Sequence, residues 1–233
     1  MTVLSAEEIE VVLLSLRVAL WAVLVGLPPA VLAAWLLARA RFPGKALVDG
    51  LLHLPLVVPP VIVGYTLLVL FGRQGVVGAF LYDTFGVVLA FNWKGAAVAA
   101  GVMAFPLMVR AIRLSIEAID KRIETAARTL GAGPVRVFAT ITLPLALPGI
   151  LSGTVLAFAR SLGEFGATIT FVSNIPGETR TLPLAIYNLT QIPGSDAAIL
   201  RLVLISIGVA LLALVLSEFL SRRVAARIRG GPL

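Results

Sequence analysis

The sequence predicts an all-α polytopic membrane protein that crosses the bilayer five times, with its N-terminus outside and its C-terminus in the cytoplasm. Hydrophobic residues make up 59% of the 233 residues and charged residues only 13%, whereas an average soluble domain is about half apolar and about a quarter charged. Long uncharged runs recur along the chain, and the basic residues gather in alternate connections between them. These observations argue against a soluble enzyme and against a disordered chain.

Five apolar runs are long enough, or nearly long enough, to cross a bilayer, which takes about 20 residues. Lys94 and Arg201 interrupt the third and the fifth run, and we expect both side chains to reach the membrane surface from near the helix ends. Glu7, Glu8 and Glu10 precede the first run without a basic residue, which argues against a cleavable signal peptide. The predicted spans cover residues 15–38, 50–72, 88–109, 137–159 and 198–218.

The basic residues predict the orientation. Thirteen of the 19 lysines and arginines follow the first span, follow the third span or lie in the C-terminal tail. Because cytoplasmic loops of membrane proteins are rich in lysine and arginine, these segments are predicted to be cytoplasmic. The basic residues that give the net charge of +7 are then explained by the cytoplasmic segments, and they do not indicate a nucleic-acid site. The sequence divides into an external segment (1–10), a transmembrane domain (11–220) and a basic cytoplasmic tail (221–233).

Prolines lie inside most of the predicted spans, including the pairs Pro28-Pro29 and Pro59-Pro60. Each proline removes a backbone donor and tends to kink a helix. Proline is also common in ordinary transmembrane helices, but the collective pattern favours helices that bend around a pathway. Gly149 and Gly153 form a G-x-x-x-G in the fourth span, which could let two helices approach closely.

The stretch Ser161 to Gly177 is apolar but too short to cross a bilayer independently. It could continue the fourth helix, lie in the membrane interface, re-enter the membrane or form an external amphipathic loop, and periodicity does not separate these alternatives. Its polar groups are candidates for contact with a transported solute: Ser161, Glu164, Thr168, Thr170, Ser173 and Asn174.

The predicted coupling loop, residues 110–136, is the most polar part of the chain and has a helical pattern. Apolar residues recur at spacings of three and four, which predicts one amphipathic helix. Glu117 with Lys121 and Glu124 with Arg128 would form i,i+4 ion pairs on its polar face. Such a helix could lie on the bilayer or dock to a cytoplasmic partner. The apolar stripe consists of Ile112, Ile116, Ile119, Ile123, Ala127 and Leu130.

Within this loop, Gly131 followed by nine residues and then Ile141-Thr142-Leu143-Pro144 resembles the EAA loop of ABC transporter permeases. Thr125-Ala126-Ala127 occupies the EAA triplet, with the glutamate one position early at Glu124. The segments 42–46, 127–132 and 161–181 resemble the molybdate (molybdate/tungstate) uptake permeases, which have the type I importer fold. Related sulfate and tungstate permeases share parts of the pattern.

The resemblance implies the permease subunit of an ATP-driven oxyanion importer that works as a homodimer, with molybdate as the ion that its motifs favour. It implies a cytoplasmic ATPase dimer, which uses the ATP, and an external oxyanion-binding protein, with no cofactor in this chain. The only near match to a phosphate loop, Gly44-Lys45-Ala46, lacks the first Gly and the final Ser/Thr. The residues that the resemblance assigns to ATPase coupling are Glu124, Thr125, Ala126, Ala127, Arg128, Gly131, Ile141, Leu143 and Pro144.

Other functions have less support in the sequence. The single histidine, His53, lies in an apolar span, and without a second histidine or any cysteine a metal site is disfavoured. An ion-coupled secondary transporter would need an intramembrane acid and usually an internal repeat, and a membrane scaffold would need neither pathway nor ATPase. Within transport, a sulfate or tungstate permease is the main alternative.

Overall fold

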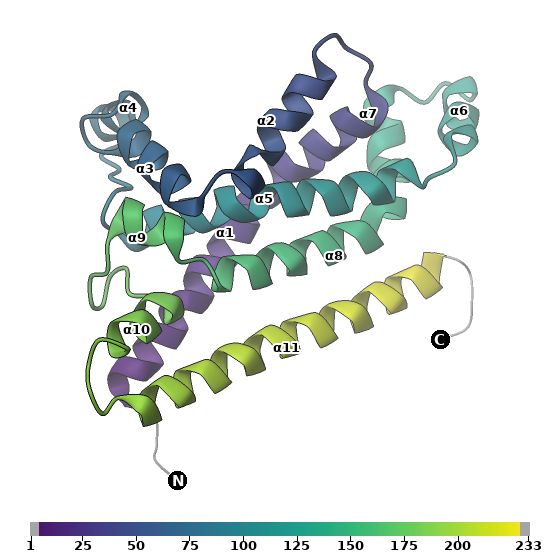
Figure 1. Cartoon of the computed structure of the whole chain (residues 1–233). Helices are drawn as coiled ribbons and strands as arrows, with labels where there is room; N and C mark the ends of the chain where they lie inside the picture. Colours follow the sequence, from purple (N-terminus) through teal and green to yellow (C-terminus); the bar gives the residue numbers. More distant parts are fainter. Residues whose placement is uncertain (1–4, 229–233) are drawn as a thin grey trace.

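Helices form all the regular structure of residues 5–228, the part of the chain that the computed structural model describes (Figure 1). This confirms the predicted all-α class; residues 1–4 of the predicted external segment and residues 229–233 of the predicted basic tail lie outside the described residues. Within these described residues, four helical segments are long and apolar enough to cross a membrane, and a bent helix pair makes up to five. The four are α1 (Ala6–Arg39), α5 (Trp93–Glu117), the segment Pro134–Leu162 and α11 (Asp196–Ile228).

Helix α1 is longer than its predicted span. Ser5 accepts a hydrogen bond from the Glu8 amide while the Glu8 carboxylate accepts one from the Ser5 amide, which forms a capping box at its start. Its 34 residues extend about 51 Å, well beyond a hydrocarbon core of about 30 Å. Pro28 and Pro29 lie within the helix without ending it.

The second predicted span is divided into α2 (Lys45–Val57) and α3 (Pro60–Phe71), which meet at 112°. Pro59 forces Val58 into an extended conformation, with φ −74° and ψ 138°. Pro60 then starts the new helix, where its missing N–H has no carbonyl partner to lose. The paired prolines therefore bend this segment, as predicted, and sharply enough to make two helices.

The fourth predicted span begins earlier than expected and has an irregular start. α7 (Pro134–Val137) passes into a π-helical turn, η1 (Phe138–Thr142), and then into α8 (Leu143–Leu162). Pro144 has no N–H for the carbonyl four residues earlier, so the regular ladder is interrupted. The Leu143 amide donates instead to the Phe138 carbonyl, five residues back.

Three short helices lie at one end of the bundle (Figure 1). α4 (Val76–Phe85) and α10 (Leu182–Leu189) have no counterpart in the sequence prediction. α9 (Gly166–Val172) lies in the stretch Ser161 to Gly177, for which the sequence allows a helix continuation, an interfacial segment, a re-entrant segment or an external loop. It is separated from α8 at Gly163 and packs against α3 and α5, so it neither continues the fourth helix nor forms an exposed loop.

Helix α5 lies at the centre of the bundle and packs along α1 on one side and α8 on the other. A Cβ added at Gly149 of α8 would lie 2.1 Å from Ser115 Cβ, and one at Gly153 would lie 3.1 Å from the Met108 carbonyl oxygen. The predicted role of the G-x-x-x-G in close helix approach is thereby confirmed. α1 begins and α11 ends at opposite ends of the bundle (Figure 1).

Candidate functional site

The predicted coupling loop contains two helical segments and not the single amphipathic helix expected. α5 continues to Glu117, and a new helix, α6 (Lys121–Thr129), starts after a break at Ile119. Asp120 causes this restart, because its carboxylate accepts a hydrogen bond from the Arg122 amide at 2.9 Å and caps α6.

The break also divides the predicted apolar stripe. Ile112 and Ile116 are fully buried in the core between α1, α5 and α8, whereas Ile123 is 48% exposed and Leu130 is 88% exposed. The prediction of one continuous apolar face is therefore wrong. Its first half is core, and its second half is an apolar surface on a helix that projects from the end of the bundle (Figure 1).

The ion pairs predicted along this helix are replaced by others. Glu117 pairs with Arg113, one turn earlier, at 2.8 Å. Glu124 turns away from the surface of α6 and pairs with Arg39 at the end of α1, at 3.0 Å. The end of α5 at Glu117 separates Glu117 from Lys121, which begins the next helix. The buried contact with Arg39 outweighs the predicted pair of Glu124 with Arg128, because an exposed pair is worth only a few tenths of a kcal/mol.

Glu124 is the only residue of α6 that is buried, at 5% exposure. One of its oxygens accepts a hydrogen bond from the Thr142 hydroxyl at 2.8 Å, in addition to its contacts with Arg39. A second guanidinium nitrogen of Arg39 donates to the Ile119 carbonyl at 3.3 Å. This anchor cluster (Arg39, Ile119, Glu124 and Thr142) joins α6 to the end of α1 and to the π turn before α8.

Gly131 ends α6 in a left-handed conformation, with φ +86°. Its amide donates to the Arg128 carbonyl, and the Ala132 amide donates to the Ala127 carbonyl, which is the hydrogen-bond pattern of a Schellman motif. A Cβ added at Gly131 would meet nothing within 4 Å. The left-handed backbone conformation, and not a close approach within the described chain, therefore favours glycine at this position.

The remaining residues assigned to coupling differ in their exposure. Thr125, Ala126 and Arg128 are exposed, and Ala127 is half-buried. Ile141 lies in the π turn, Leu143 packs against the core, and Pro144 follows it in the first turn of α8.

Sequence reasoning missed Arg39 and Thr142 of the anchor cluster. Thr142 is the variable position of the I-x-L-P match, whereas nothing in the sequence marks Arg39.

The polar residues proposed to contact a solute have mostly internal partners. Glu164 is 3% exposed, pairs with Arg160 at 2.6 Å and accepts a hydrogen bond from the Ala167 amide at 2.8 Å, which holds the start of α9. The Ser161 and Thr168 side chains are buried, and Asn174 accepts a hydrogen bond from Arg180. Thr170 donates to the Gly166 carbonyl, and Ser173 is exposed with φ +65°.

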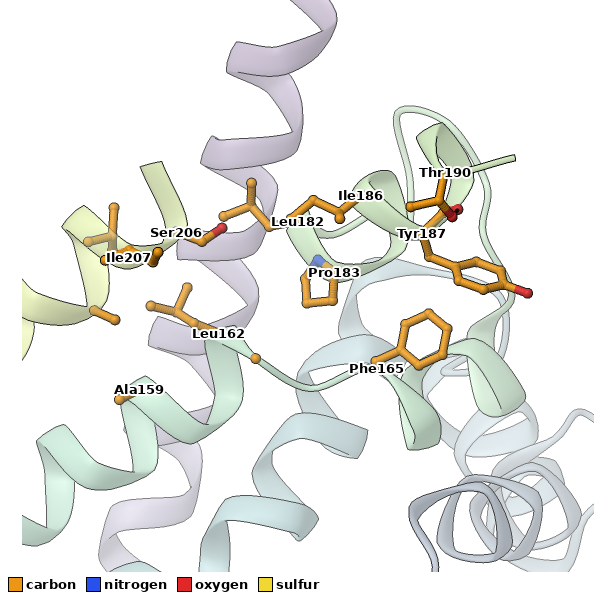
Figure 2. Close-up of a pocket in the computed structure, with 13 residues that line it drawn as sticks. Ala159, Leu162, Phe165, Leu182, Pro183, Ile186, Tyr187, Thr190, Ser206 and Ile207 are labelled. Atoms are coloured by element: carbon orange, nitrogen blue, oxygen red, sulfur yellow. Dashed lines mark hydrogen bonds between the residues drawn. The ribbon is translucent and has the colours of Figure 1, made fainter. Parts of the chain in front are cut away.

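An apolar groove of about 630 Å³ lies beside these residues, between α8, α10 and α11 (Figure 2). Phe165 and Tyr187 contact each other at one end of it, with their ring centroids 5.1 Å apart and their ring planes tilted by 56°. The residues described as lining it include no charged side chain and none of the six solute candidates. This groove therefore lacks the groups that would bind a small anion.

His53 has local partners at the opposite end of the bundle. Its Nδ1 lies 2.8 Å from the Asp49 carbonyl oxygen and 3.2 Å from the Asp49 carboxylate, which also pairs with Arg113 at 2.8 Å. Within the described part of the chain, no group of three or more potential metal ligands comes together.

The arrangement of long helices around α5, with a short exposed helix beyond its end, defines the class. It is the fold of the transmembrane subunits of ABC importers. A crystal structure of a bacterial ABC transporter involved in the import of the acidic polysaccharide alginate matches with a TM-score of 0.73 and 21% identity, over 94% of this chain and 80% of that chain. The methionine ABC transporter MetNI matches with a TM-score of 0.67 and 16% identity, over 93% of this chain and 94% of that chain.

Residues 26–226 match the family described as the binding-protein-dependent transport system inner membrane component, and the chain belongs to that family. It is therefore an inner-membrane transport subunit. The molybdenum transport system permease protein ModB of Escherichia coli K12 is 63% identical over 220 residues, covering 94% of this chain and 96% of the relative. ModB of Haemophilus influenzae is 57% identical over 224 residues, covering 96% and 98%.

A more distant relative has a different name. The sulfate transport system permease protein CysT of Salmonella typhimurium is 40% identical over 156 residues, which covers 67% of this chain and 56% of the relative.

Proposed function

We propose that this chain is the permease subunit of an ATP-driven molybdate importer, and that it forms the pathway as a homodimer. The 63% identity with a molybdenum transport permease over nearly the whole of both chains supports molybdate. The sulfate permease relative shares less identity over a shorter length, which makes sulfate the second candidate. Tungstate remains the third, because its size and charge are close to those of molybdate.

We propose that the end of the bundle that carries α6 is cytoplasmic. The connections at this end and the end of α11 together hold most of the basic residues, including Lys45, Arg113, Arg122, Arg128 and Arg136. Cytoplasmic loops are enriched in such residues. The start of α1 is then external and the end of α11 is cytoplasmic.

α6 is proposed to dock into a cytoplasmic ATPase. Its apolar surface, formed by Ile123, Ala126 and Leu130, is exposed and continues to Val135, which is 78% exposed. An exposed apolar patch next to basic side chains suits a protein partner. The anchor cluster would transmit a movement of the docked α6 directly to α1 and to the start of α8, and so couple the ATPase to the transmembrane helices.

The homodimer is supported by the exposure of α11. Only 6% of its membrane segment is buried, compared with 61% for α5. We propose that a second copy covers part of this surface together with the apolar groove of Figure 2.

Ion selectivity is proposed to lie mainly in the external binding protein. The solute candidates near α9 offer hydroxyl and amide groups, and the nearby cation Arg160 is already paired with Glu164. Weak, transient contacts of this kind would let an oxyanion pass without holding it. Exchanging only the binding protein for a sulfate-specific one should then change the transported ion; an unchanged ion would mean that the permease itself selects.

The direct test is reconstitution of the chain with its ATPase and binding protein in proteoliposomes. We expect ATP-dependent uptake of molybdate that exceeds uptake of sulfate when both are supplied at equal concentration. Uptake driven by an ion gradient in the absence of ATP, or uptake of sulfate alone, would overturn the proposal.

A further inference from the structure

A second apolar groove, of about 630 Å³, runs between α1 and α5 on another part of the molecule. The groove is lined in part by glycine and proline, which have small side chains: Gly26 and Pro29 of α1 and Gly101 of α5. A Cβ added at Gly101 would approach the Ala22 backbone only to 3.5 Å. Apart from Arg17 and Lys94, the residues described as lining this furrow carry no charge.

Two cations stand at one mouth of this groove. The Arg17 guanidinium carbon lies 3.7 Å from the centroid of the Trp93 ring, and Lys94 follows Trp93 in the first turn of α5. Both cationic residues are exposed, and neither has a carboxylate within 4.0 Å among the described residues. By contrast, Arg201 at the same end of the bundle pairs with Glu8 at 2.7 Å.

The position of Arg17 along α1 corresponds to a membrane surface. Arg17 precedes Arg39 by 22 residues, or about 33 Å of helix, which matches a hydrocarbon core of about 30 Å. Trp21 and Trp93 lie beside the mouth with their ring centroids 6.3 Å apart, and tryptophans favour the level of the lipid headgroups. The cations therefore lie at headgroup depth, and the groove descends from them into the hydrocarbon.

We propose that this groove binds an anionic phospholipid of the leaflet at the α9 end, with its phosphate between Arg17 and Lys94 and one acyl chain along the groove. The chemistry of the site has two parts that such a lipid satisfies together: unpaired positive charge at the surface and an uncharged furrow below it. A free oxyanion would engage only the cations. A second copy of the chain would have to bury two unpaired cations against protein, which is costly without acidic partners.

In this position the lipid fills the furrow and contacts α1 and α5 together. It binds through groups outside the anchor cluster and outside the proposed solute contacts. The inference therefore does not depend on which ion the protein transports.

The test measures the thermal unfolding of the detergent-purified full chain with added phosphatidylglycerol, phosphatidylcholine, inorganic phosphate or molybdate. We expect phosphatidylglycerol alone to raise the melting temperature, and the double variant Arg17→Gln/Lys94→Gln to bind it about 30-fold more weakly. The charge-conserving variant Arg17→Lys/Lys94→Arg should keep the response. Arg73→Gln is the matched control, because Arg73 is an exposed cation outside the groove that contacts Tyr82.

A groove-filling variant separates a lipid from a free anion. Gly101→Leu keeps both cations but occupies the furrow, so it should abolish the response to phosphatidylglycerol while the chain still elutes as a folded species. Equal stabilisation by phosphatidylcholine, the same stabilisation by phosphate or molybdate, or an unchanged response in Gly101→Leu would each overturn the proposal. A change from dimer to monomer in the double variant, without loss of lipid binding, would assign the surface to a second copy instead.

Discussion

Replacement of Glu124 by alanine should release α6 from the rest of the bundle. Glu124 is the one buried residue of α6, and its side chain and that of Arg39 are only 7% and 9% exposed. Removal of one partner from a buried ion pair typically costs about 3–5 kcal/mol, because the other charge is left without compensation. The Arg39 bond to the Ile119 carbonyl remains, so we expect a local cost near about 3 kcal/mol.

Hydrogen exchange measures this cost directly. A loss of about 3 kcal/mol corresponds to roughly two orders of magnitude in the local opening equilibrium. Amides of residues 121–132 should therefore exchange roughly 100-fold faster in Glu124→Ala, while those of the α5 core should be unchanged. In the reconstituted complex, ATP hydrolysis should continue while uptake falls.

Two further variants control the interpretation. Thr142→Val removes only the hydroxyl and should cost about 1 kcal/mol. Arg39→Met/Glu124→Leu removes both charges and should recover much of the protection, because no unpaired charge is left buried. Wild-type exchange in Glu124→Ala would refute the idea that this ion pair holds α6.

Three other substitutions test separate features. Gly131→Val should insert normally but lose uptake, because a β-branched residue at φ +86° costs about 1–3 kcal/mol; full uptake would contradict this. Gly149→Ala should lower the melting temperature, since its Cβ would lie 2.1 Å from a side chain of α5, whereas Gly208→Ala, with nothing within 4 Å, should not; equal effects would contradict the close approach. Glu164→Gln should weaken the Arg160 pair and the start of α9, which limited proteolysis between α8 and α9 would detect; an unchanged cleavage pattern would count against it.

The sequence predicted those features that depend on local chemistry. Hydropathy located the long helices, the Pro59-Pro60 pair predicted a bend, and Gly131 has the left-handed conformation typical of a glycine that ends a helix. The angle between α2 and α3 is not local information, because it depends on how both helices pack. The short helices α4 and α10 are too brief to show a clear periodicity.

The coupling loop shows why pattern alone failed there. Ile116, Ile119 and Ile123 keep helical spacing through the break, so periodicity continues where the helix does not. The deciding residue is Asp120, whose side chain offers the backbone an alternative to a continuous helix. The partner of Glu124 was equally out of reach, because Arg39 lies 85 residues away in the chain.

The register of α6 explains why the glutamate stands one position earlier than the EAA pattern would place it. Each residue advances an α-helix by about 100°, so Glu124 and Thr125 point in different directions. Glu124 is buried against Arg39 and Thr142, whereas Thr125 is exposed and donates to the Lys121 carbonyl. A carboxylate moved to position 125 would face solvent. The double variant Glu124→Ala/Thr125→Glu should therefore behave like Glu124→Ala in hydrogen exchange and in uptake, and restored protection would show that α6 can rotate to recover its ion pair.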